Sequence, residues 1–224
     1  MKRSAAPGFS LRATLSATLA LLAGLASVAP VSAAEAAAAG DAWPTLERVR
    51  ASLIADGPAG AEFVQTYVPA GFSTGEEERG RLALALPDCL RWDYEEPYPK
   101  SFLLCGEEAF YWNPEDGTGR RYSIDREAEP GLDLLLLGLE ELRERYQAEA
   151  ESAGGRVAVT LTPKRELVEL AGARMVVDEA SRRLVEVSYT DREGGRSRFV
   201  LTGYRPIEED GLFSPPEGIV WEQE

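Results

Sequence analysis

The chain has 224 residues, of which 24 are basic, 38 are acidic and none is histidine, so its formal net charge is −14 at pH 7. Such an acidic protein is not expected to bind nucleic acid or an anionic bilayer by charge alone. Without histidine, the usual general base and the usual metal ligand are missing. We therefore expect no enzyme, no cofactor and no metal site. The length suggests one domain, or at most two small ones.

Residues 1–33 have the pattern of a secretory signal peptide. Lys2, Arg3 and Arg12 form a basic start, an apolar run follows, and small residues precede the expected cleavage after Ala33. A retained membrane anchor is the alternative, although the apolar run is short for a membrane span. No cysteine stands directly after this run, so a lipid-modified N-terminus is not expected. Removal of the segment would make the charge −17 and leave a soluble, exported, monomeric domain over residues 34–224.

The first part of that domain combines a loose leader, a helix and two strands. The leader is the Ala-rich segment Ala34–Asp41. Apolar residues at helical spacing predict an amphipathic helix over Thr45–Ala55, which ends at Asp56-Gly57-Pro58. Alternation predicts strands over Ala61–Val68 and Glu77–Leu86. Between these strands, Gly71 to Gly75 matches G-x-S-x-G around Ser73, but no helix and no histidine accompany it, so we interpret it as a hairpin loop.

The segment Gly80–Pro114 dominates the pattern. Four short stretches alternate apolar and polar residues between Pro- or Gly-containing turns, which is typical of antiparallel strands with one dry face. If even-numbered positions share that face, it carries Leu82, Leu84, Leu86, Leu90, Trp92, Phe102, Leu104, Phe110 and Trp112. The acidic groups Asp93, Glu95, Glu96, Glu107 and Glu108 lie at hairpin ends or turns, so a pair of catalytic carboxylates on the dry face is not expected.

The two cysteines, Cys89 and Cys105, lie inside this segment. If the hairpin folds around Pro97, residues whose numbers sum to 194 face one another, so Cys89 faces Cys105 and Trp92 faces Phe102. An exported protein would be expected to form a cross-strand disulfide there. Two buried free thiols are the alternative, because a hairpin register can slip.

A leucine-rich segment follows and then a return to strands. We predict two short helices, an apolar one over Gly131–Leu139 and a polar one over Glu140–Glu151. The apolar helix would cover the sheet with Leu132, Leu134, Leu135, Leu136, Leu137 and Leu139. From Arg156 onward alternation resumes, and about ten or eleven short antiparallel strands imply a barrel or a strongly curved sheet. Its large apolar residues could simply fill the core, or they could leave space for hydrocarbon.

Several short motifs together resemble the LolA family of periplasmic outer-membrane lipoprotein carriers. The motifs are Leu86-Pro87-Asp88-Cys89-Leu90-Arg91-Trp92-Asp93-Tyr94, Phe110-Tyr111-Trp112-Asn113-Pro114, Phe63-Val64-Gln65, Leu161-Thr162-Pro163-Lys164 and Phe213-Ser214-Pro215-Pro216-Glu217-Gly218. They follow the family's order over most of the domain. The resemblance implies an unclosed β-barrel with a helical lid, and a cavity for lipoprotein acyl chains.

On this resemblance, the cargo-binding residues would be Leu84, Leu86, Leu90, Trp92, Phe102, Leu104, Phe110 and Trp112. Cargo would come from an ATP-driven releasing complex of the inner membrane and pass to an outer-membrane acceptor. A lid-holding arginine that many family members carry is replaced here by Leu86. We expect Leu90→Glu to lower cargo retention and leave the fold intact. A carrier of another amphiphile, such as a glycolipid, and a lipoprotein-sensing module are the alternatives.

Overall fold

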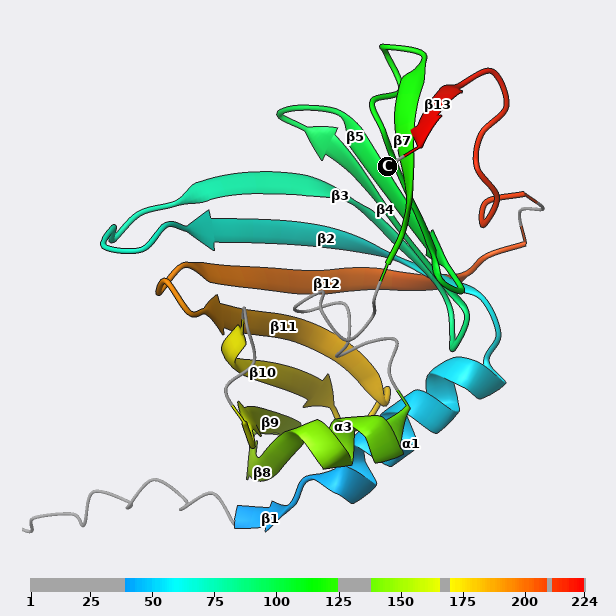
Figure 1. Ribbon diagram of the computed structural model, residues 1–224. Helices are drawn as coiled ribbons and strands as arrows, with labels where there is room; N and C mark the ends of the chain where they lie inside the picture. Colours follow the sequence, from blue (N-terminus) through cyan, green and yellow to red (C-terminus); the bar gives the residue numbers. More distant parts are fainter. Residues whose placement is uncertain (1–38, 125–137, 166–169, 209–210, 224) are drawn as a thin grey trace, which may run out of the picture. The chain divides into compact units, whose positions relative to one another are not determined.

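One sheet of thirteen strands organises the computed structural model, which describes residues 39–124, 138–165, 170–208 and 211–223 (Figure 1). The strands follow the order β1-β8-β9-β10-β11-β12-β2-β3-β4-β5-β6-β7-β13. The outermost strands, β1 and β13, are not paired with each other, so the sheet is not closed. This confirms the expected mainly β, unclosed and largely antiparallel class. More strands are present than the ten or eleven predicted.

The strands are β1 Ala39–Asp41, β2 Ala59–Val68, β3 Glu76–Ala85, β4 Cys89–Glu96, β5 Lys100–Cys105, β6 Glu108–Trp112, β7 Thr118–Ser123, β8 Tyr146–Ala153, β9 Arg156–Pro163, β10 Leu170–Asp178, β11 Arg183–Asp191, β12 Arg196–Pro206 and β13 Val220–Gln223. The described helices are α1 Trp43–Ala55 and α3 Leu139–Arg145. Neighbouring strands are antiparallel except for the parallel pair β13 and β7.

Helix α1 forms where the spacing predicted it. Its buried residues Thr45, Leu46, Val49 and Leu53 recur at intervals of three and four, so they form one apolar stripe. At the start, the Asp41 carboxylate accepts the Trp43 N–H at 3.1 Å. At the end, the chain leaves the helix through Gly57, whose φ of +73° favours glycine. Both ends are therefore encoded locally.

The predicted polar helix over Glu140–Glu151 is wrong beyond its first half. Helix α3 ends at Arg145, and residues 146–153 form strand β8 between β1 and β9. In β8, Tyr146 and Ala150 are buried while Gln147 and Glu149 are exposed. Cross-strand pairing therefore outweighs the helix propensity of these charged residues. The same pairing turns Ala39–Asp41, predicted as part of a loose leader, into β1.

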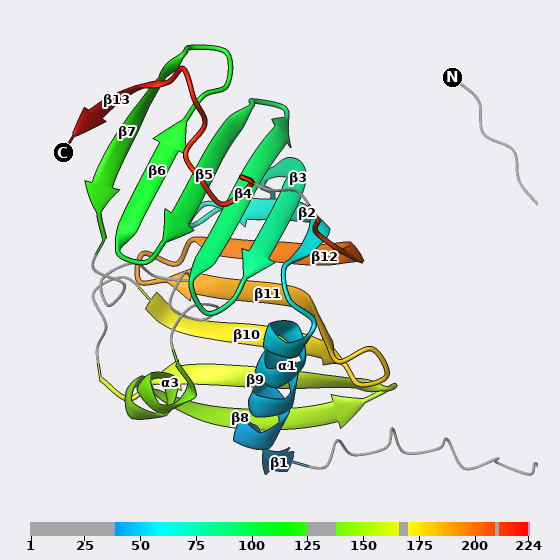
Figure 2. The same cartoon turned by 90° about the vertical axis from the view of Figure 1, so that its right-hand side faces the viewer.

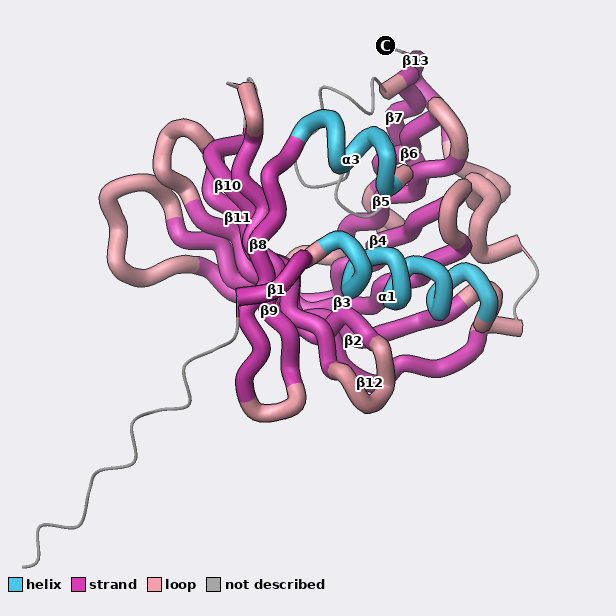
Figure 3. The backbone as a smooth tube through the Cα atoms, turned by 90° about the horizontal axis from the view of Figure 1, so that it is seen from below, coloured by secondary structure: helices cyan, strands magenta, loops and turns pink. Residues whose placement is uncertain are grey.

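The sheet has two faces that differ in what covers them. We call the face that carries Phe63, Leu90 and Val159 the inner face, and the opposite one the outer face. Residues of α1, α3 and the inner face belong to one hydrophobic core, and α1 contacts β11 while α3 contacts β8. The two helices also contact each other, and Figure 3 shows them as neighbours on this side of the sheet. The Arg143 guanidinium lies 5.6 Å from the Trp43 ring centre. Both helices thus cover the inner face of one half of the sheet.

The β4–β5 hairpin has the predicted register. Cys89 faces Cys105 and Trp92 faces Phe102, and the two sulfurs form a disulfide. The even-numbered residues Leu82, Leu84, Leu90, Trp92, Phe102 and Leu104 pair across β3, β4 and β5 on the inner face. The numbers of facing residues add to an even total in both pairs of strands, so even-numbered residues face even-numbered residues. The predicted even-numbered face is therefore continuous across these three strands.

Removal of the disulfide is expected to lower the free energy of unfolding by about 3 kcal/mol, because the bridge closes a short loop in the unfolded chain. The two cysteines are 16 residues apart. The double variant Cys89→Ala/Cys105→Ala should melt about 6–12 °C below the parent. Thermal unfolding with and without reductant measures this. Reductant should lower the parent's midpoint and leave the variant's unchanged, and equal midpoints for the parent and the variant would contradict the prediction.

The even-numbered face breaks at the β5–β6 turn. Leu103 faces Phe110 and Ser101 faces Trp112, so this register sum is odd. Only Gly106 and Glu107 separate the two strands, and the positions that share a face therefore exchange parity. The prediction that Phe110 and Trp112 lie beside Leu90 is wrong, because both side chains point to the outer face.

A separate core forms around these two residues on the outer face. Leu103, Phe110 and Trp112 are buried there beneath Phe213, Ile219 and Trp221 of the C-terminal segment, residues 211–223. The Trp221 ring lies 5.2 Å from Phe110 and 6.0 Å from Trp112, measured between ring centres. Arg91 stacks over Trp112 and donates a hydrogen bond to the Leu212 carbonyl at 2.9 Å. Figure 2 shows this segment crossing the sheet before it ends as β13 beside β7.

Candidate functional site: the inner face of the sheet

A row of aromatic rings contributed by six strands crosses the inner face. The rings are, in order, Tyr111, Phe102, Tyr94, Phe63, Phe199 and Tyr189, and the distances between successive ring centres are 4.8, 5.9, 4.9, 6.0 and 6.5 Å. Phe63 is buried and the other five rings are half-buried. Such spacings are typical of favourable aromatic pairs. The row therefore forms a continuous apolar surface against which further apolar groups can pack.

Gly80 makes the middle of the row possible. It lies on β3 between Phe63 of β2 and Tyr94 of β4, and those two rings meet edge to face at 4.9 Å. A Cβ at Gly80 would stand 2.0 Å from the Asp93 carbonyl oxygen and 2.9 Å from the end of the Phe63 ring. A side chain does not fit there, so the glycine lets rings from non-adjacent strands touch.

Tyr94 gives the row a polar anchor. Its hydroxyl donates to the Gln65 side-chain oxygen at 2.6 Å, and the Lys100 ammonium lies 4.4 Å from the centre of its ring. Lys100 also pairs with Glu78 at 2.6 Å. Burial, with a smaller contribution from Glu78, raises the pKa of Tyr94, so the hydroxyl stays neutral. The ring is thus held by a hydrogen bond and by contact with the Lys100–Glu78 ion pair, and it carries no charge of its own.

A cavity of about 40 Å³ lies where α1 and α3 meet the sheet. It is lined by Leu46, Val49, Arg50, Leu53, Leu86, Leu139, Leu142, Met175 and Leu184. A water molecule occupies about 30 Å³ in the liquid, so the cavity is far smaller than an acyl chain. The expected surplus of apolar space is therefore not found at this junction of the described residues.

Arg50 is the charged group in this cavity. It comes from α1 and lines the same space as Leu86, the position where the sequence resemblance had implied an arginine. Burial lowers the pKa of the Arg50 guanidinium, and the carboxylate of Glu141 on α3 partly opposes that shift. Glu141 also accepts the Gly138 N–H at 2.8 Å, which holds it at the start of α3. A guanidinium is thus present at this junction, but it is supplied by a helix.

The structure divides the predicted cargo-binding residues into three groups. Leu84, Leu90 and Leu104 are buried in the inner core. Leu86, Trp92 and Phe102 are half-buried on the inner side, and Phe110 and Trp112 belong to the separate outer core. Leu90 is 0 % exposed, so Leu90→Glu would bury a carboxylate. We therefore expect this variant to lose its fold, contrary to the prediction from the sequence.

The predicted lid falls mostly outside the described residues. Leu132, Leu134, Leu135, Leu136 and Leu137 are in that part, as is the predicted signal peptide, residues 1–33. Leu139 is described, begins α3 and lines the cavity. No group of three or more metal-ligating side chains occurs within the described ranges. Ser73 of the G-x-S-x-G match is exposed in the β2–β3 loop.

Sequence reasoning found Phe102 and missed the other members of the aromatic row. Two of the missed rings belong to the segment Gly80–Pro114 itself, and three come from the distant strands β2, β11 and β12. A usable signal was Gly80 in the middle of an otherwise apolar strand, because such a glycine often marks the close approach of other groups. The partners that approach it could not be read without strand order. The missed rings are Tyr94, Tyr111, Phe63, Tyr189 and Phe199.

These features define a protein with an unclosed antiparallel sheet and an apolar inner face partly covered by helices. The family model described as "Outer membrane lipoprotein carrier protein LolA" matches residues 59–214. This chain belongs to that family.

Curated relatives agree with this assignment. An outer-membrane lipoprotein carrier protein of Chromobacterium violaceum is 27% identical over 166 residues, which are 71% of this chain and 78% of the relative. One from Xanthomonas oryzae pv. oryzae is 29% identical over 105 residues, 46% of this chain and 50% of that protein.

A solved structure shows the likeness in fold. An uncharacterized conserved protein from Thermus thermophilus covers 82% of this chain and 99% of its own, with a TM-score of 0.52 and 10% identity. The LolA superfamily protein NE2245 from Nitrosomonas europaea also matches, over 79% of this chain and 98% of its own, with a TM-score of 0.45 and 10% identity. Among the described residues, neither helix has the length and hydropathy that crossing a bilayer requires.

Proposed function

We propose that this protein is a periplasmic carrier that binds the acyl chains of lipoproteins and takes them from the inner to the outer membrane. The observation that carries the proposal is the half-buried aromatic row on the inner face of a LolA-family sheet. Each CH₂ removed from water contributes about 0.8 kcal/mol, so one long acyl chain would lose on the order of 10 kcal/mol in water. A carrier must offer comparable apolar contact, and the row supplies rings for it.

The binding step then requires a movement of the helices. Because the cavity beneath α1 and α3 holds about 40 Å³, acyl chains reach that part of the inner face only when the helices separate from β10 and β11. Arg50 lies at the junction that would open, where burial lowers the pKa of its guanidinium and Glu141 opposes that shift. Residues 1–33 would direct export and be removed, and the domain from residue 34 would act as a non-enzymatic monomer. An ATP-driven releasing complex would load it and an outer-membrane acceptor would unload it.

The direct test is native mass spectrometry of the protein purified from its own periplasm before any contact with detergent. We expect a mass increment equal to one acylated lipoprotein. A glycolipid mass would make the protein a carrier of another amphiphile. Protein without any cargo in cells that export lipoproteins would contradict the carrier role.

Locking α1 to the sheet is expected to abolish loading. Val49 of α1 and Leu184 of β11 line the same small cavity, so Val49→Cys/Leu184→Cys places one thiol on each element, and mild oxidation can join them as a disulfide. The described residues include no free cysteine that would compete. The joined protein should take up less than about a tenth of the lipoprotein bound by the same variant before joining, in a reconstituted release assay. Each single-cysteine variant, treated alike, is the control, and full loading of the joined protein would show that these helices need not move.

A further inference from the structure

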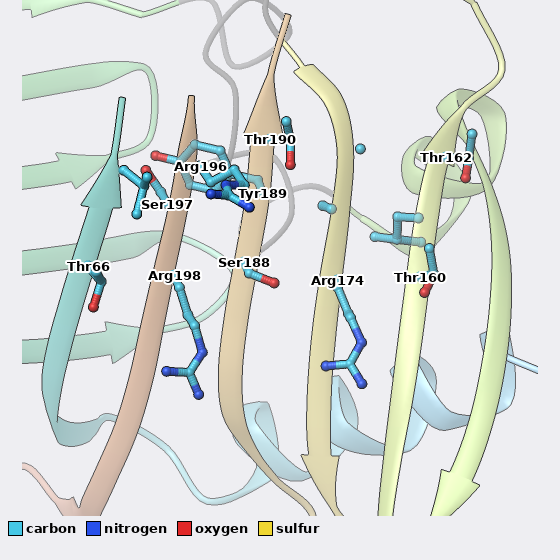
Figure 4. Close-up of a pocket in the computed structure, with 14 residues that line it drawn as sticks. Thr66, Thr160, Thr162, Arg174, Ser188, Tyr189, Thr190, Arg196, Ser197 and Arg198 are labelled. Atoms are coloured by element: carbon cyan, nitrogen blue, oxygen red, sulfur yellow. The ribbon is translucent and has the colours of Figure 1, made fainter. Parts of the chain in front are cut away.

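A groove of about 550 Å³ lies on the outer face, away from the helices (Figure 4). It crosses strands β2, β12, β11, β10 and β9. Each of these strands has a neighbouring strand on both sides, so the groove does not offer a free sheet edge. Whatever binds there must be recognised by side chains rather than by strand addition.

The side chains of the groove form an ordered polar pattern. One cross-strand line runs Thr66, Arg198, Ser188, Arg174 and Thr160, so hydroxyl and guanidinium groups alternate over five strands. Figure 4 shows Arg198 and Arg174 projecting from the sheet on the same side. The next line places Arg196 beside Thr190. The groove therefore presents three guanidinium groups and several hydroxyls, beside the apolar groups of Val68, Leu161 and Ala173.

Glu186 holds two of these arginines in place and leaves the groove positive. Its carboxylate accepts from Arg198 at 2.7 Å and lies 3.7 Å from Arg174. The two arginine side chains keep about half of their surface exposed, 55% and 47%. Arg196 is exposed and has no ion-pair partner among the described residues. The lining of the groove contains these three arginines and no acidic residue, although the chain has a net charge of −14.

The spacing suits an extended chain that carries carboxylates at alternate positions. Arg196 and Arg198 lie two residues apart on β12, which corresponds to about 6.8 Å along a strand. Residues i and i+2 of an extended peptide have the same separation and direction. Guanidinium groups pair with carboxylates through two parallel hydrogen bonds, and the surrounding hydroxyls can bond the peptide backbone.

We propose that this groove binds an acidic, extended segment of a partner protein. A membrane surface fits it less well, because the groove is concave and because Glu77 and Glu149 stand at the two ends of the Arg198–Arg174 line. Glu149 would repel anionic lipid, whereas Glu77 is paired with Arg79 at 2.7 Å, and a narrow chain can lie between the two. The groove opens on the face opposite the aromatic row, and Tyr189, the last ring of that row, also contributes to its lining.

The test uses fluorescein-labelled Gly-Glu-Thr-Glu-Thr-Glu-Gly and the full protein, followed by fluorescence anisotropy at low and moderate salt. We expect the parent to bind this peptide, with an affinity that falls as salt is added. The affinity of Arg196→Gln/Arg198→Gln should be at least tenfold lower. The peptide with Gln in place of Glu should not bind. Arg81→Gln is the matched control, since Arg81 is an exposed arginine of β3 outside the groove that pairs with Glu95. It should bind like the parent.

A single Arg196→Glu variant separates a loss of binding from a loss of the fold. Arg196 has no ion pair within the described part of the chain, so its replacement removes no such contact. It should reduce peptide binding while its circular dichroism and melting temperature stay those of the parent. Equal peptide binding by the parent, Arg196→Glu and Arg81→Gln would overturn the proposal. So would stronger binding to vesicles that contain 30% phosphatidylglycerol, lost in Arg196→Glu, with no binding of the peptide.

Discussion

Phe102→Asp is expected to reduce the lipoprotein that remains bound to the protein by about ten- to a hundredfold. Phe102 is a half-buried member of the aromatic row, between Tyr94 and Tyr111. Loss of the contact of one large apolar side chain with an acyl chain costs about 1.5–3 kcal/mol, and each 1.4 kcal/mol is a factor of ten in affinity. The new carboxylate adds a desolvation penalty whenever hydrocarbon covers it.

The measurement is the yield of lipoprotein that co-purifies with the variant, relative to the parent. Phe213→Asp is the matched control, because Phe213 is also a half-buried phenylalanine but packs on the outer core. Circular dichroism should show that both variants fold. If Phe102→Asp and Phe213→Asp retained cargo equally well, the inner face would not be the binding surface.

Gly80→Ala is expected to destabilise the fold by about 1–3 kcal/mol or more. The added Cβ would meet the Asp93 carbonyl oxygen at 2.0 Å, and backbone cannot rotate away as a flexible side chain can. Strands β3 and β4 must then separate locally, and the contact between Phe63 and Tyr94 is lost. Both stability and cargo retention should fall, since one residue supports the sheet and the aromatic row together.

Urea unfolding of Gly80→Ala and Gly172→Ala separates this effect from a general response to added methyl groups. Gly172 is also a strand glycine, but its nearest neighbour to a Cβ, the Leu161 carbonyl oxygen, is at 3.6 Å, an ordinary contact. Gly172→Ala should leave stability unchanged or raise it by less than about 1 kcal/mol. Equal midpoints for the two variants would show that the close approach at Gly80 does not constrain the sheet.

The local sequence pattern was sufficient to predict elements whose ends and pairing are determined within one short segment. The apolar spacing of α1 and the stop at Gly57 lie within one short segment, and the β4–β5 register follows from a single turn around Pro97. Strand β8 failed because its charged residues favour a helix in isolation, and only pairing with β9 and β1 makes it a strand. Information about a distant neighbour was needed, and no local pattern contains it.

The candidate site was predicted as far as β5 and not beyond. Trp92 and Phe102 lie on the inner face as expected. Phe110 and Trp112 do not, because one two-residue turn exchanges the parity of all later positions in the hairpin. The rings contributed by β11 and β12 join the row only because β12 pairs with β2 across a long sequence separation. The order of the strands in the sheet was thus the information that prediction of the site lacked.

The two short end strands have a consequence for self-association. β1, of three residues, lies beside β8, and β13, of four residues, lies beside β7. A long exposed edge strand offers its free amide and carbonyl groups to another copy and invites aggregation. Among the described residues, β1 pairs with residues 149–151 of β8 and β13 pairs with residues 118–121 of β7, so a short strand covers part of each longer edge. Fewer backbone groups of each edge are then open to another copy, which lowers the tendency of the sheet to polymerise at its ends.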